Sequence, residues 1–131
     1  MAASAAIILG LGLLHLLFTF RGPNLTPRDP ALQQRMTEVS LVLTSRTTMW
    51  KAWVGFNASH SLGAILFGLI YGWLALVNSD LLFGSPFLIA VGLAMLAGLA
   101  VLGKLYWFRD PYRCICVALA CYVAAIVMSR G

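Results

Sequence analysis

Residues 86–108 read PFLIAVGLAMLAGLAVLGKLYWF, an apolar run that contains a single charged residue, Lys104. A helix needs about 20 apolar residues to cross the ~30 Å hydrocarbon core of a bilayer, so this run is long enough to span it. Inside lipid the backbone must satisfy its own hydrogen bonds, which only helices and closed barrels achieve. The run is too long and too uniformly apolar for a barrel strand, and it therefore predicts a transmembrane helix.

Three further apolar runs predict the same structure: residues 3–20, 53–77 and 112–129. Of the 131 residues, 61% are hydrophobic and 10% are charged, whereas soluble domains are about 45–50% apolar and about 25% charged. A chain of this length could not bury so much apolar surface in its own interior. The expected fold is an all-α membrane protein, a single domain over residues 1–131 with four transmembrane helices in an up-down bundle.

The connection between the first two spans predicts a short amphipathic helix over residues 30–44. Asp29 supplies a capping oxygen, and Pro30 supplies the preset φ of a first helical position. Leu32 and Met36 lie four residues apart with polar residues between them, which is helical spacing. Such a helix would lie either in the headgroup region or against the base of the bundle, and the sequence leaves both open.

Basic residues predict how the chain is threaded. Five lie between or beside the first two spans, three flank the third connection, and one follows the last span: Arg21, Arg28, Arg35, Arg46 and Lys51; Lys104, Arg109 and Arg113; and Arg130. Because loops rich in Lys and Arg stay in the cytoplasm, we expect both basic connections there and both termini outside. The net charge of +5 then reflects contact with anionic lipid, and we expect no nucleic-acid partner.

Polar side chains interrupt the second apolar run. Asn57, His60 and Ser61 share one helical face, because they lie three or four residues apart. The first run carries His15 and Thr19 in one stripe, and a rise of ~1.5 Å per residue places both histidines roughly 8–10 Å inside the cytoplasmic boundary. Polar groups in lipid are costly and normally face protein, so we expect these five side chains to face one another across the first two helices.

Small residues form two rows on the second run. They are Ala64, Gly68 and Gly72, which continue the polar face, and Gly55, Ser59 and Gly63, which form a separate row. Small rows let neighbouring backbones approach closely within a membrane. We therefore expect this helix to contact two neighbours.

Three interpretations of the polar cluster remain open. In the first, the polar groups brace the first two spans through hydrogen bonds. In the second, they line a pocket for a quinone, a lipid or a similar amphiphile, with Trp53, Phe56 and Phe67 as apolar walls. In the third, His15 and His60 are the axial ligands of a b-type haem. A zinc site is not expected, because two histidines without a nearby carboxylate or thiolate are an incomplete ligand set.

No residues in the sequence point to an enzyme. The four acidic residues lie at or outside the expected membrane boundary, so no acid pair is embedded in the membrane. Ser59 and His60 are adjacent in the chain and face different directions on a helix, so they do not form a nucleophile–base pair. We therefore expect no catalytic residues.

The stretch RTTMWKAWVGFNASHSLGAILFGLIYGW at residues 46–73, with LGLLHLLFTF at 11–20 and LLFGSPFL at 81–88, resembles an uncharacterised bacterial family. Its members are small four-helix inner-membrane proteins with a GFNASHSLG-type motif, and the resemblance covers nearly the whole chain. It implies a multi-pass protein of the bacterial inner membrane with both termini in the periplasm, and it implies no activity.

Together these patterns predict an accessory or assembly subunit of a larger membrane complex. Its partners would be the lipid bilayer and other membrane subunits or further copies of itself, and the polar cluster would brace the first two helices. The alternative is a binding module for a quinone, a lipid or a b-type haem at the same cluster.

Overall fold

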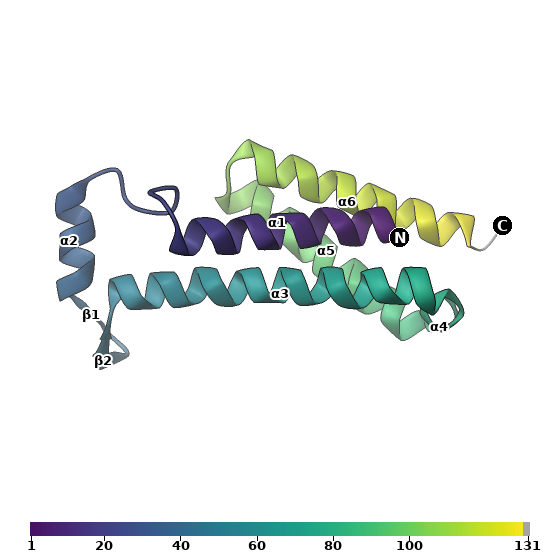
Figure 1. The fold of residues 1–131 in the computed structure, drawn as a ribbon, viewed down its shortest axis with the longest axis horizontal. Helices are drawn as coiled ribbons and strands as arrows, with labels where there is room; N and C mark the ends of the chain where they lie inside the picture. The colour runs from purple at the N-terminus through teal and green to yellow at the C-terminus, as the bar shows by residue number, and fades with distance from the viewer. Residues whose placement is uncertain (130–131) are drawn as a thin grey trace. The chain divides into compact units, whose positions relative to one another are not determined.

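The computed structural model describes residues 1–129, and most of them are helical (Figure 1). Four helices are long and apolar enough to cross a membrane: α1 (Ala2–Phe20), α3 (Met49–Val77), α5 (Pro86–Tyr106) and α6 (Arg109–Met128). Each overlaps one of the four predicted runs, as expected of a multi-pass membrane protein. Arg130, the basic residue expected outside the membrane, lies beyond the described residues.

Two of these helices begin at least three residues earlier than the sequence predicted. α3 begins at Met49 instead of residue 53, and the Thr48 hydroxyl accepts a hydrogen bond from the backbone N–H of Lys51 at 3.4 Å. α6 begins at Arg109 instead of residue 112, because Pro111 falls in the first turn, where a missing N–H leaves no hydrogen bond unmade. Apolarity alone sets the predicted starts, whereas local backbone chemistry sets the observed ones.

The predicted helix over residues 30–44 is wrong beyond residue 38. α2 (Pro30–Glu38) starts as expected, with an Asp29 carboxylate oxygen accepting the Ala31 N–H at 2.9 Å. The chain then forms an antiparallel hairpin of β1 (Ser40–Leu41) and β2 (Thr44–Thr48). Residues 39–48 (VSLVLTSRTT) are rich in β-branched side chains, which favour extended backbone over helix.

A short helix also lies in the second connection, where none was predicted. α4 (Ser79–Gly84) follows Asn78 directly, and its Leu82 is fully buried. The Ser85 hydroxyl then accepts the Leu88 N–H at 3.3 Å and caps the start of α5. The connection is therefore an ordered helical turn.

Two compact units make up the described chain. The larger consists of residues 1–11 together with the chain from Ala64 onward, and the smaller consists of residues 12–63. The larger unit holds α4, α5, α6 and the apolar core, and the smaller holds α2, the hairpin and the predicted polar cluster. The expectation of a single domain stays a prediction.

Three helices of the larger unit meet at Gly92. Tyr71 of α3 donates a hydrogen bond to the Leu88 carbonyl at 2.7 Å, and Tyr122 of α6 donates to the Ile89 carbonyl at 3.0 Å. A Cβ atom on Gly92 would lie 2.7 Å from Tyr71 Cε1 and 2.7 Å from Tyr122 Cζ. Both buried rings can therefore reach the start of α5 only because residue 92 has no side chain.

Gly68 brings α1 against α3 in the same unit. A Cβ atom at this position would lie 2.6 Å from Leu9 Cβ and 2.9 Å from the Ala5 carbonyl oxygen. One turn later, a Cβ atom on Gly72 would lie 3.7 Å from Ala5 Cβ, which is an ordinary van der Waals distance. Within the predicted row of small residues, Gly68 is thus the position of closest approach.

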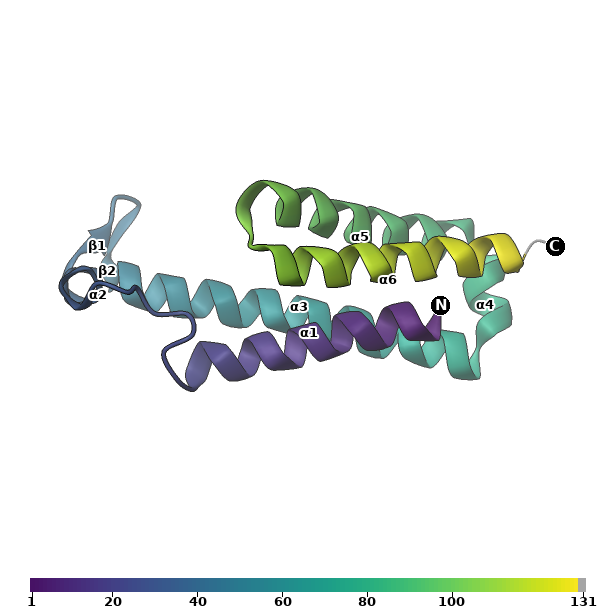
Figure 2. The same cartoon turned by 90° about the horizontal axis from the view of Figure 1, so that it is seen from above.

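α5 and α6 run beside one another in both views (Figures 1 and 2). α5 ends at Tyr106, two residues before its predicted end, and Trp107 and Phe108 link it to α6. A Cβ atom on Gly103 would lie 3.4 Å from Tyr112 Cδ2, so the two helices are close already at this end. The two-residue connection and the close approach at Gly103 together make α5 and α6 an antiparallel pair.

Candidate functional site

His15 of α1 and Asn57 of α3 form a hydrogen bond in the smaller unit, with His15 Nε2 3.0 Å from Asn57 Oδ1. Because an amide oxygen only accepts hydrogen bonds, the proton lies on His15 Nε2. The bond joins two helices that are 42 residues apart in the chain. Asn57 is buried and His15 is partly buried, so the bond lies where competing water is scarce and an unmade bond is costly.

Asn57 is also the centre of a longer chain of hydrogen bonds. Its Nδ2 donates to the Trp53 carbonyl one turn earlier at 2.8 Å. The Trp53 indole N–H in turn donates to the Leu25 carbonyl at 2.9 Å and so holds the loop that follows α1. Both polar ends of the Asn57 amide are therefore in use, and the loop, α1 and α3 are tied together.

Thr19 and Ser61 bond within their own helices and not across to the neighbouring one. The Thr19 hydroxyl donates to the His15 carbonyl at 2.8 Å, and the Ser61 hydroxyl donates to the Asn57 carbonyl at 2.9 Å. Hydroxyls of serine and threonine commonly bond back to the carbonyl four residues earlier. The two side chains lie beside the expected cluster, but they do not connect its helices.

The two imidazole rings are in direct contact. The centroids of His15 and His60 lie 5.4 Å apart, and the ring planes cross at 81°, so the edge of one ring meets the face of the other. Edge-to-face contact is a favoured arrangement of aromatic rings. His15 thus contacts α3 twice, through Asn57 and through His60.

A cavity of about 140 Å³ lies next to Asn57 in the smaller unit. Its lining comes from the end of α1, the loop after it and the start of α3, and includes Phe18, Thr19, Leu25, Trp50, Trp53 and Asn57. Ligand pockets usually enclose about 300–1,000 Å³, whereas a cavity of about 150 Å³ holds one benzene molecule. The cavity is therefore the right size for one ring or a few water molecules.

Two of the three expected pocket walls do not line this cavity. Trp53 lines it, but the Phe56 side chain is 71% exposed. Phe67 is buried in the larger unit, where its ring stacks on Tyr71 with the centroids 4.4 Å apart. Phe56 comes directly before Asn57, so its side chain points about 100° away around the helix, and Phe67 belongs to the other compact unit. Neither phenylalanine is among the residues that line this cavity.

The arrangement of the histidines bears on the haem interpretation. An iron atom held between two imidazoles needs the lone pair of one nitrogen from each ring. The proton on His15 Nε2 is donated to Asn57, so that nitrogen has no lone pair to offer. Iron binding would require His15 to use Nδ1 or to break its bond with Asn57. Within residues 1–129, no three His, Cys, Asp or Glu side chains are grouped closely enough to hold a metal ion.

Some contacts around the cluster could not be found from the sequence. Trp53 was expected as an apolar wall, and the structure adds that its indole N–H donates a hydrogen bond to the Leu25 carbonyl and holds the loop there. Tyr71 and Tyr122 of the larger unit stand within apolar runs, and nothing in the sequence indicates which groups their hydroxyls contact. A loop carbonyl offers no side-chain pattern, so the partners of these hydroxyl and indole groups appear only in three dimensions.

No protein-family model matches this chain, and neither does any curated protein or solved structure. The resemblance to a bacterial inner-membrane family therefore stays a prediction. The chemistry of the site has to be inferred from its geometry.

Replacing Asn57 with alanine should lower the free energy of unfolding by about 1–2 kcal/mol, because it leaves the partly buried His15 N–H without its partner. The double variant with His15→Ala should show a coupling energy of about 0.6 kcal/mol and at most about 1.7 kcal/mol, the mean and the maximum known for hydrogen bonds between helices in a membrane. Unfolding in mixed micelles, followed by tryptophan fluorescence, measures both quantities.

Ser59→Ala is the matched control, because the exposed Ser59 hydroxyl bonds only within its own turn, to the Phe56 carbonyl. We expect it to change stability by less than about 0.5 kcal/mol. Strictly additive effects of the Asn57 and His15 substitutions would mean that the bond does not join the two helices in the membrane.

Proposed function

We propose that this chain is a small integral inner-membrane protein that serves as an accessory or assembly subunit of a larger membrane complex. The observation that carries the proposal is the engagement of Asn57: both ends of its amide are hydrogen-bonded, one to His15 and one to Trp53. A side chain that is already engaged in this way suits a brace between helices better than it suits a ligand site. The braced helices would then present a fixed surface to a partner.

An open row of small residues on α3 supports an interaction role. Cβ atoms added at Gly55 and Gly63 would meet nothing within 4 Å, and Ser59 between them is exposed. Rows of small residues spaced four apart let a second transmembrane helix approach closely. We therefore place the contact with a partner subunit, or with a second copy of the chain, along this row.

The proposed placement in the membrane follows the distribution of charge. Eight basic residues belong to the two connections that would face the cytoplasm, which favours both termini in the periplasm. The four spanning helices would form an up-down bundle, and α2 would act as the amphipathic helix at the cytoplasmic surface. The bacterial source rests on the family resemblance.

The double substitution Gly55→Leu and Gly63→Leu tests the interaction. It should shift the protein from a larger complex to the mass of a single chain on native gels in mild detergent, because two leucines fill the open row. Val101→Phe adds bulk at an exposed position of α5 and should leave the complex intact. If the double variant forms the same complex, the row of small residues on α3 is not the contact surface.

A second candidate, the binding of a small amphiphile, is favoured by the cavity beside Asn57 and Trp53. Its size admits a single ring, such as the head of a quinone, more readily than a whole lipid or a haem. Native mass spectrometry should detect one bound small molecule per chain if this function is correct. A Soret band that disappears in His60→Ala would instead establish a b-type haem and would overturn the proposed brace.

A further inference from the structure

The tip of the β1–β2 hairpin presents two uncovered aliphatic side chains. Val42 and Leu43 connect the strands, and their exposed fractions are 110% and 91%. These are the highest values among the large hydrophobic side chains of the described chain. Tight turns in water are normally built from glycine, asparagine, aspartate, serine and proline. Two adjacent aliphatic residues at such a turn therefore suggest that the tip meets an apolar phase.

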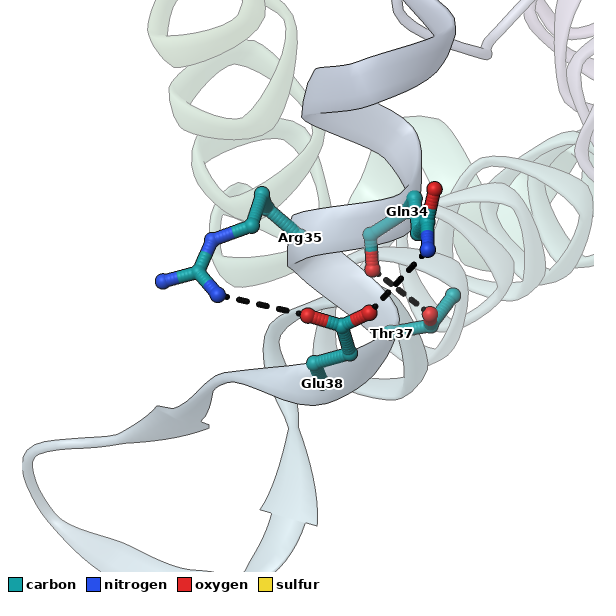
Figure 3. Close-up of polar contacts among 4 residues, drawn as sticks. All are labelled: Gln34, Arg35, Thr37 and Glu38. Carbon is teal, nitrogen blue, oxygen red and sulfur yellow. Dashed lines mark hydrogen bonds and ion pairs between the residues drawn. The ribbon is translucent and has the colours of Figure 1, made fainter.

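The connection that carries this tip is basic. Residues 21–51 contain five basic and two acidic residues, which gives a net charge of +3. Arg46 on β2 is exposed, and so is Lys51 at the start of α3. Glu38, one of the two acidic residues, accepts hydrogen bonds from Arg35 and Gln34 (Figure 3). The positive charge left over is complementary to an anionic leaflet, which attracts basic segments next to a membrane.

α2 has the orientation of a helix that lies on a membrane surface. α3 runs horizontally in Figures 1 and 2, whereas α2 stands upright in the first view and is seen end-on in the second. α2 therefore lies across the axis of α3, and both the hairpin and the first half of α3 belong to the same compact unit. If α3 crosses the bilayer, α2 runs parallel to the bilayer surface.

The side chains of α2 fit that position. None of its residues is buried, and Leu32 is half exposed. Gln34, Arg35, Thr37 and Glu38 bond among themselves and with the helix backbone (Figure 3). A short helix with one apolar edge and a bonded polar edge is typical of the headgroup region.

We propose that Val42 and Leu43 insert into the boundary between headgroups and acyl chains of an anionic leaflet, with Arg46 binding lipid phosphate. The inference rests on the proposed function only in that α3 must cross the membrane. It assigns the connection a lipid partner, whereas the proposed function assigns the open row of α3 a protein partner.

A spin label at position 43 tests the proposal. The three free cysteines, Cys114, Cys116 and Cys121, are replaced by alanine, Leu43→Cys is labelled, and the chain is placed in nanodiscs of phosphatidylglycerol or of phosphatidylcholine. The label should be accessible to oxygen and shielded from a water-soluble nickel complex in phosphatidylglycerol. Arg46→Gln should increase its accessibility to nickel in phosphatidylglycerol and change little in phosphatidylcholine.

Two labelled positions serve as controls. Thr37→Cys on the polar side of α2 should be open to the nickel complex, and Leu66→Cys on an exposed part of α3 should be accessible to oxygen alone. A label at position 43 that is open to nickel, or closed to both reagents because protein covers it, overturns the insertion. A label at position 66 that is open to nickel would overturn the membrane placement of α3 itself.

Hydrogen exchange provides a second test on the unmodified chain and does not depend on how the cysteine-free variant folds. Backbone amides at the hairpin tip should exchange several-fold more slowly in phosphatidylglycerol nanodiscs than in phosphatidylcholine nanodiscs. Equal rates in the two lipids would contradict a role of anionic headgroups in holding the tip.

Discussion

Gly92→Ala should lower the free energy of unfolding by about 3 kcal/mol, the upper part of the usual range for overpacking a core. The added methyl group would lie 2.7 Å from carbons of both Tyr71 and Tyr122. Neither ring can move away without losing its hydrogen bond to a carbonyl of α5. The loss should be visible as a lower midpoint when the detergent-solubilised protein is unfolded with a denaturing detergent.

The cause can be separated from general helix effects with two further variants. Gly98→Ala lies on the same helix at a position where an added Cβ meets nothing within 4 Å, so its stability should stay equal or increase slightly. Tyr122→Phe removes the hydroxyl that contacts position 92, and in the Gly92→Ala background it should recover part of the lost stability. If Gly92→Ala is as stable as Gly98→Ala, the three helices do not meet as described.

Gly68→Ala should also cost about 2–3 kcal/mol, because its methyl group meets the backbone of α1. The Ala5 carbonyl oxygen would be 2.9 Å from the added atom, and a backbone atom cannot turn aside as a flexible side chain can. α1 would have to move away along this part of α3. Thermal inactivation measured by size-exclusion chromatography in detergent should show the loss.

Gly72→Ala, one turn further along α3, provides the comparison. Its added methyl group would lie 3.7 Å from Ala5 Cβ, so the substitution should change stability by less than about 0.5 kcal/mol. Equal effects at the two positions would show that α1 does not approach α3 most closely at Gly68.

The spanning helices could be predicted from the sequence because lipid leaves the backbone few alternatives. The pairing of His15 with the face of Asn57 and His60 could be anticipated for a related reason, since polar groups within an apolar run have to find partners in protein. A sequence pattern therefore predicts structure well where lipid permits only one arrangement of the backbone or of a polar side chain.

Other features depend on details that periodicity does not carry. Leu32 and Met36 keep helical spacing, but the segment at residues 39–48 favours extended backbone, and a short apolar stretch fits either structure. Thr19 and Ser61 could bond across helices or within their own, and the choice depends on rotamers. Phe56 and Phe67 were assigned to a pocket from their apolar character, whereas the Phe56 side chain is largely exposed and Phe67 packs in the core of the other unit.

α3 contains 29 residues, which at ~1.5 Å per residue amounts to about 43 Å. A bilayer core of ~30 Å cannot cover that length with the helix upright. The excess is absorbed by tilt or by extension into the headgroup layer, and the Met49 end carries Trp50 and Lys51, which tolerate that layer. A thicker membrane would therefore draw the Met49 end of α3 deeper into the headgroup layer, and a thinner one would leave more of it in water. The position of the hairpin relative to the headgroups would then depend on bilayer thickness.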